Sequence, residues 1–215
     1  MVLGHVETFK DLGVVIDSEL QLTMHGYGKI NLAYEMLGII KRNFTNLGTV
    51  SFLILYKSFV RCHLEFANSV WNPYKISIIK DLEKVQKRAT KCIKGLFNVP
   101  YVERLRRLNL PTLKYRRLRG DMIEVYKILT ASYFSLGSPE LVRNVNSRTR
   151  GNSLKLLVKR SRLDIRKFSF CVRVVNIWNS LPNWVVESQS VNAFKNNFDK
   201  FSKTKEVFYN YESDW

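Results

Sequence analysis

Apolar residues recur at spacings of three and four along the first half of this 215-residue chain, and this periodicity constrains its fold most. The spacing is that of residues on one face of an α-helix. Three successive segments carry it, through Ile30, Ala33, Tyr34, Leu37, Ile40 and Phe44; then Phe52, Leu55, Tyr56, Phe59 and Val60; then Ile79, Leu82, Val85, Ala89, Ile93 and Leu96. A single amphipathic helix cannot bury its apolar face alone, so we expect an antiparallel helical bundle.

Polar residues and proline mark the ends of these predicted helices. Asn46 and Gly48 end the first helix, Thr49 caps the second, and the second stops before Pro73. Ser77 caps the third. Its basic residues are expected to face solvent: Lys80, Lys84, Lys87, Arg88 and Lys91.

The second half of the chain predicts further helices. Two of them are hinged at Asn109 and Pro111, and their apolar residues are Leu105, Leu108, Leu113, Leu118, Met122, Tyr126 and Leu129. A later helix covers 168–181 and is ended by Pro182. Ser190 caps a last helix, whose apolar side holds Val191, Phe194, Phe198 and Phe201.

Strand signals are few. The segment 9–17 is short and β-branched, and Gly13 within it predicts a bulge or a close backbone approach. This strand has no obvious partner in the chain, so its sheet is either very small or continued by a missing N-terminal part. A second, possible short strand covers 153–158.

The fold class that follows is mainly α, with a short N-terminal strand, a helical bundle and a smaller helical C-terminal part. Serine, glycine, proline and asparagine become frequent over 132–151, which predicts a linker or long loop. The expected organisation is a strand and turn over 1–24, the bundle and basic helices over 25–131, that linker, and a C-terminal helical region over 152–215.

The charge balance points to a polyanionic partner. Lysine and arginine outnumber aspartate and glutamate by 35 to 18, a formal net charge of +17. Such an excess favours nucleic acid or an anionic membrane, and of these nucleic acid. The longest apolar run, near 50–60, is interrupted by Ser51, Lys57 and Ser58, so no segment is expected to span a membrane. Three widely spaced cysteines and the lack of a secretory signal predict an intracellular protein, nuclear or cytoplasmic.

The sequence contains no motif that could hold a reaction: no paired aspartates, no HExxH, no glycine-rich phosphate loop and no CxxC. Asp11 and Asp17 flank the predicted strand without a third acid nearby, so we expect no two-metal site. Cys62 and His63 are adjacent, and on a helix their side chains point about 100° apart. Together with Cys92, they are expected to be packing residues rather than zinc ligands. No catalytic residue, metal or cofactor is predicted.

Two basic stretches are the candidate nucleic-acid contacts. The first stretch is Arg104, Arg106, Arg107, Lys114, Arg116, Arg117 and Arg119, flanked only by Glu103 and Asp121. The second is Arg148, Arg150, Lys155, Lys159, Arg160, Arg162, Arg166 and Lys167, opposed by Asp164. The scarcity of acids favours phosphate binding over ordinary solvated helix faces, and arginine forks onto phosphate oxygens. Trp71 and Trp178 follow apolar helical faces and are expected in the core, whereas Trp184 could pack or stack on bases.

Five runs of the sequence carry a family resemblance. They read KDLGVVID (10–17), LYKSFVRCHLEFANSVWNPY (55–74), LEKVQKRATKCIKGL (82–96), LPTLKYRRLRGDMIEVYKIL (110–129) and RLDIRKFSFCVRVVNIWNSLP (162–182). In this order they closely resemble the C-terminal end of the reverse transcriptase reading frame of a non-LTR retrotransposon, of the jockey or chicken-repeat type.

The resemblance implies a division of the chain. Residues 10–17 match the end of the palm, 29–96 match the thumb region, and the rest matches the C-terminal region. The family's Tyr-x-Asp-Asp metal site and its endonuclease domain would lie before Met1, so no polymerase activity is expected of this fragment. The leading hypothesis is a remnant that binds the backbone of RNA, DNA or a hybrid duplex. The alternatives are a gene-model fragment of an active RNA-directed DNA polymerase with its palm upstream, and a domesticated protein-interaction module or non-functional relic. The oligomeric state stays open.

Overall fold

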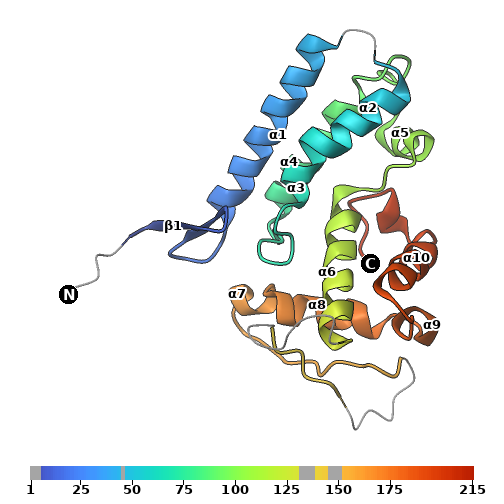
Figure 1. Cartoon of the computed structure of the whole chain (residues 1–215). Coiled ribbons are helices and arrows are strands. Elements are labelled where there is room, and N and C mark those ends of the chain that lie inside the picture. Colours follow the sequence, from blue (N-terminus) through green and yellow to red (C-terminus); the bar gives the residue numbers. More distant parts are fainter. Residues whose placement is uncertain (1–5, 45–46, 131–138, 145–151) are drawn as a thin grey trace. The chain divides into compact units, whose positions relative to one another are not determined.

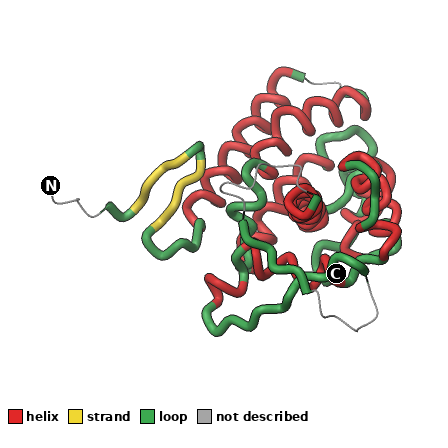
Figure 2. Tube along the Cα trace, turned by 60° about the horizontal axis from the view of Figure 1, so that its bottom comes forward, coloured by secondary structure: helices red, strands yellow, loops and turns green. Residues whose placement is uncertain are grey.

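The computed structural model describes residues 6–44, 47–130, 139–144 and 152–215, and it is mainly helical, as predicted (Figures 1 and 2). Residue contacts divide the chain into two compact units. Unit 1 is Met1–Lys114 with Tyr209–Tyr211, and unit 2 is Tyr115–Phe208 with Glu212–Trp215. The division lies within one helix rather than in 132–151, a segment that falls largely outside the described residues.

Unit 1 begins with a β-hairpin, shown as two yellow strands in Figure 2. Strand β1 (Thr8–Asp11) pairs antiparallel with β2 (Val14–Asp17), so that Thr8 faces Asp17 across the pair. The single strand predicted over 9–17 is therefore wrong. Leu12 and Gly13 have φ angles of 44° and 83° and form a two-residue turn, a conformation that glycine adopts without strain. Gly13 marks the reversal of the chain, which supplies the partner strand, and not a bulge.

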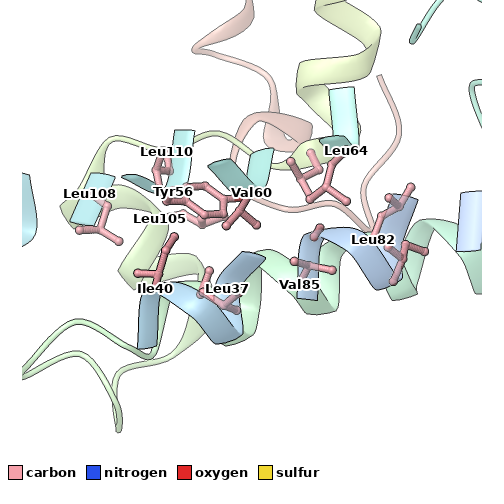
Figure 3. Packing of buried hydrophobic residues seen from close by; sticks show 14 of the residues in the cluster. Leu37, Ile40, Tyr56, Val60, Leu64, Leu82, Val85, Leu105, Leu108 and Leu110 are labelled. Atoms are coloured by element: carbon pink, nitrogen blue, oxygen red, sulfur yellow. The ribbon is translucent and has the colours of Figure 1, made fainter. Parts of the chain in front are cut away.

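The rest of unit 1 is the predicted helical bundle, and its core is shown in Figure 3. Its helices are α1 (Thr23–Asn43), α2 (Thr49–Leu55), a π-helix (Tyr56–Arg61), α3 (Cys62–Glu65), α4 (Ile76–Thr90) and α5 (Tyr101–Leu108). Leu37 and Ile40 of α1 share one buried cluster with Leu82 and Val85 of α4. The pairing of these two apolar faces confirms the bundle.

The second predicted helix departs from a regular α-helix. Its buried residues are Phe52, Tyr56, Val60 and Leu64, each four apart, whereas Phe59 is 52% exposed. A π-helix has more residues per turn than an α-helix, because its hydrogen bonds run from i to i+5. The wider turn keeps every fourth residue on the core side and rotates Phe59 into solvent, so the prediction of a buried Phe59 is wrong.

Two smaller expectations about helix ends and faces also fail. Gly48 and Lys75 occupy the N-cap positions of α2 and α4, and Thr49 and Ser77 lie inside these helices. In α4 the residue buried before Leu82 is Ile78, while Ile79 is only half-buried. Spacings of three and four both fit a helical face, so periodicity alone does not choose between neighbouring isoleucines.

Unit 2 is also helical. It contains most of α6 (Leu113–Leu129), then α7 (Asp164–Lys167), α8 (Phe170–Asn179), α9 (Asn183–Val186), α10 (Val191–Ser202) and a 3₁₀ turn (Glu206–Phe208). Aromatic rings form its core, with Tyr126 stacked on Phe194 at 4.4 Å between centroids. The Ser190 hydroxyl accepts a hydrogen bond from the Ala193 amide at 3.1 Å, which confirms the predicted cap of the last helix. The expected strand over 153–158 is reduced to one bridge between Arg143 and Leu156.

Candidate nucleic-acid interface

The first basic stretch is not a continuous exposed surface. Arg104 and Arg117 are buried, with 2% and 3% of their surface exposed. Lys114, Arg116 and Arg119 are half-buried, and Arg106 and Arg107 are exposed. Alternation of buried and exposed positions is what a helix packed on one side requires, so Arg104 and Arg117 lie inside the fold and only part of this stretch reaches the surface.

Two carboxylates engage exposed or partly exposed arginines of this stretch. Glu103 accepts Arg107 at 3.0 Å and lies 4.0 Å from Arg106. Asp199 of α10 accepts Arg119 through both carboxylate oxygens, at 2.5 and 2.7 Å. Asp199 stands eighty positions along the chain, so counting acids near the arginines in the sequence missed it.

Arg104 has a packing role in unit 1. Its Nη2 donates to the Lys87 carbonyl at 3.3 Å, and its guanidinium lies 5.5 Å from the centre of the Tyr101 ring. Burial lowers the pKa of Arg104. A guanidinium held in this way is not available to phosphate oxygens.

Most of the described residues of the second basic stretch are exposed. Arg148 and Arg150 lie outside the described residues, and Lys155 is half-buried. Five cations remain, all exposed, and we call them the basic segment: Lys159, Arg160, Arg162, Arg166 and Lys167. In the described part of the chain none of the five forms an ion pair with a carboxylate. Asp164, the acid among them, is exposed as well.

Polar side chains of unit 2 fix the chain leading into the basic segment. Asn179 of α8 exchanges two hydrogen bonds of 2.8 Å with the backbone of Leu156. The Trp178 indole donates to the Leu154 carbonyl at 2.8 Å, and buried Asn152 donates to the Trp178 and Leu181 carbonyls. The extended backbone around Leu156 is thereby held against α8, although it belongs to no sheet. Sequence reasoning missed these asparagines.

The end of the basic segment is fixed by the corner between α7 and α8. The Ser169 hydroxyl donates to the Arg166 carbonyl at 2.7 Å, and Arg173 donates to the Phe168 carbonyl at 3.1 Å. Arg173 is itself held by both oxygens of Asp121, at 2.9 and 3.0 Å. Arg166 and Lys167 therefore project from a corner with a defined backbone.

Helix α4 of unit 1, with its C-cap residue Lys91, carries another cationic surface, the α4 stripe, consisting of Lys80, Lys84, Arg88 and Lys91. All four are exposed, as predicted, and their spacings of four and three place them on one side of the helix. Lys87, which was also expected to face solvent, is half-buried. Some of them have partners: Lys84 pairs with Asp81 at 2.7 Å, and Arg88 lies 5.6 Å from the Tyr34 ring centre. From the sequence, we expected these side chains to face solvent and did not propose them as a contact surface. Their spacing along one face of the helix was the signal that could have indicated such a surface.

The other candidates of the sequence are cysteine, histidine and tryptophan residues. Among the described residues, no three histidine, cysteine, aspartate or glutamate side chains cluster as metal ligands would. Cys62 is exposed, contrary to the expectation of a buried cysteine, and its thiol donates to the Ser58 carbonyl one turn earlier in the helix. Trp71 and Trp178 are buried, as predicted, and Trp184 is 48% exposed.

None of the described helices combines the length and the hydropathy needed to cross a membrane. Comparisons of the chain with protein-family models, with curated proteins and with solved structures find no match.

Proposed function

We propose that this chain binds RNA or DNA through backbone phosphates and that the basic segment makes the main contacts. The observation that carries the proposal is the exposure of five cations within nine residues, none of them paired with a described carboxylate. Lysine and arginine that neutralise phosphates release condensed counterions, which is the main source of sequence-independent affinity. The formal net charge of +17 would also speed association with a polyanion.

The proposed binding is directed at the backbone and reads no base. Phosphate contacts fix the position of a protein on a nucleic acid without carrying sequence information. On the resemblance of the five sequence runs quoted above, we also propose that the chain derives from a non-LTR retrotransposon reverse transcriptase. The catalytic aspartate pair of that family is not contained in this sequence, so binding rather than polymerisation is proposed for it.

Fluorescence anisotropy with labelled single-stranded and duplex oligonucleotides of several sequences, over a series of KCl concentrations, tests the proposal. If about four phosphates are neutralised on a duplex, the slope of log affinity against log salt should be about −3.6. Replacing Arg160 and Arg162 by alanine should weaken binding to all sequences alike and flatten the slope by about two.

A matched pair replaces Arg106 and Arg107, which are also exposed but lie beside Glu103. This control removes the same formal charge and should change the slope by less than about one. If the Arg160 and Arg162 variant keeps a native circular dichroism spectrum and binds as the parent chain does, the basic segment is an ordinary solvated surface. An altered base preference in that variant would mean base reading and would contradict the backbone assignment.

A further inference from the structure

A small cavity opens in unit 2 next to the basic segment. Its volume is about 120 Å³, and residues of 140–142, 156–159, α7 and α8 line it. A water molecule occupies about 30 Å³ in the liquid, so the cavity has room for about four waters or an aliphatic group of about four carbons.

The exposure of the lining residues separates a floor from a mouth. Leu156 and Val175 are buried and Val172 is half-buried, so the floor is apolar. Lys159, Arg166 and Glu140 are exposed and form the mouth. An apolar floor beneath a charged mouth suits a ligand with one apolar and one charged end.

The charges at the mouth define the sign and size of the ligand's charge. Two cations and one carboxylate leave a formal excess of one positive charge, which matches a monoanion better than a phosphate dianion. The Arg166 guanidinium can fork onto both oxygens of a carboxylate. Burial raises the pKa of the Cys171 thiol in the wall, so the thiol is neutral at neutral pH and adds no opposing charge.

We propose that this cavity binds a small apolar carboxylate of about four carbons. Its chain lies against Leu156, Val172 and Val175, and its carboxylate lies between Lys159 and Arg166. Two sources share this chemistry, a free short-chain acid and the C-terminal residue of a peptide with an aliphatic side chain. The inference goes beyond nucleic-acid binding and does not depend on it.

Titration of the full chain with butyrate, followed by amide NMR shifts, tests the proposal. Along acetate, propionate and butyrate, each added methylene should tighten the Kd about threefold to fourfold. Butyramide, which has the same shape without the charge, should not bind. Peptides ending in valine as the free acid or as the amide form a second arm. Binding of the free-acid peptide identifies a peptide terminus as a ligand, whereas its failure beside binding of butyrate identifies the free acid.

Matched variants localise the binding. Lys159→Gln with Arg166→Gln should raise the Kd for butyrate at least about tenfold, since each charge-assisted hydrogen bond is strong. Arg160→Gln with Arg162→Gln removes the same charge outside the cavity and should leave that Kd within about twofold, although it should weaken nucleic-acid binding. Val175→Phe fills the floor of the cavity and should abolish butyrate binding. If this variant does not fold, the comparison of the two double glutamine variants still tests the proposal.

Three results would overturn the carboxylate site. They are equal loss of butyrate binding in both glutamine pairs, equal binding of butyramide, and no dependence of the Kd on chain length. None of these results tests nucleic-acid binding. The proposal of nucleic-acid binding fails separately, if the anisotropy titration of the Arg160 and Arg162 variant is the same as that of the parent chain.

Discussion

His25 joins the hairpin of unit 1 to helix α1. The side chain is buried, its Nδ1 accepts the Val15 amide at 3.2 Å, and its ring meets Trp71 edge-on with 5.0 Å between centroids. Burial, with a smaller contribution from Lys29, lowers the pKa of His25 to about 4. An Nδ1 that accepts a hydrogen bond must be unprotonated, so the attachment of the hairpin requires the neutral imidazole.

Acid should therefore loosen unit 1. An unfolded chain protonates His25 near its ordinary pKa of 6.5, whereas the folded chain resists protonation until about pH 4. Between these values the unfolded state binds more protons, so the free energy of unfolding should fall as the pH drops from about 6.5 to about 4. Urea denaturation at several pH values measures this fall.

A substitution isolates this contribution from that of the carboxylates. His25→Asn lacks a titrating ring and should show a shallower dependence on pH over the same interval than the parent chain. Equal slopes in this variant and in the parent chain would mean that His25 does not govern the acid response.

At the scale of single elements, the π-helix decides which residues of the second predicted helix are buried. Leu82 of α4 is fully buried in the cluster shown in Figure 3, and Phe59 of the π-helix is exposed. Leu82→Asp should lower the free energy of unfolding by about 3–5 kcal/mol, because it leaves an unpaired charge in the core. Phe59→Asp should change it by less than about 0.5 kcal/mol, as is usual on a surface. Denaturant unfolding of both variants measures the two changes. A large loss of unfolding free energy in Phe59→Asp would mean that Phe59 is buried, as a regular α-helix would place it.

The elements that could be predicted are those whose signal is local. The Ser190 cap and most of the apolar faces of α1 and α4 follow from spacings within one turn, and the structure confirms them. The exceptions are Phe44, which is 47% exposed and follows α1, and Ile79, which is half-buried. The hairpin was missed because its turn needs a positive φ at Leu12 as well as at Gly13. Leucine rarely adopts a positive φ, so its presence in the sequence does not indicate a turn. The π-helix was missed because its spacing of four also fits an α-helical face.

At the scale of the whole molecule, the basic stretches could be found in the sequence but not ranked. In the sequence, the first stretch has the higher density of arginine. Whether this stretch can bind phosphates depends on which of its arginines are buried and which acids pair with them. One of these acids, Asp199 of α10, pairs with Arg119 and is distant in the sequence. The five cations of the basic segment are exposed, and Asn152, Trp178 and Asn179 hold the chain that leads into it by donating hydrogen bonds to backbone carbonyls. Such tertiary partners have no local signature.

The last residues of the chain stabilise both units. In unit 1, Lys87 Nζ donates to the Tyr211 hydroxyl at 3.0 Å and lies 4.4 Å from its ring centre. In unit 2, Trp215 stacks on Phe198 at 5.6 Å between centroids and donates to the Ser180 hydroxyl at 2.9 Å. Cation–π and aromatic contacts contribute about 0.5–1.5 kcal/mol each, so deletion of 209–215 should lower the Tm by about 5–10 °C.

Scanning calorimetry measures this decrease in Tm, and single substitutions show how much each residue contributes to it. Tyr211→Ala and Trp215→Ala should each lower the Tm by part of the full amount, whereas Glu212→Ala, an exposed side chain between them, should lower it less than either. A deletion with the Tm of the full chain would show that these aromatic contacts contribute nothing.

The membership of Tyr209–Tyr211 in unit 1 has a consequence for the order in which the protein is made. A ribosome adds about 5–20 residues each second, and about 95 residues separate Lys114 from Tyr209, so roughly 5–20 seconds pass between them. Helices form and chains collapse in microseconds. The first unit therefore spends these seconds without the rings that contact Lys87 and Arg106, until Tyr209 and Tyr211 have been synthesised.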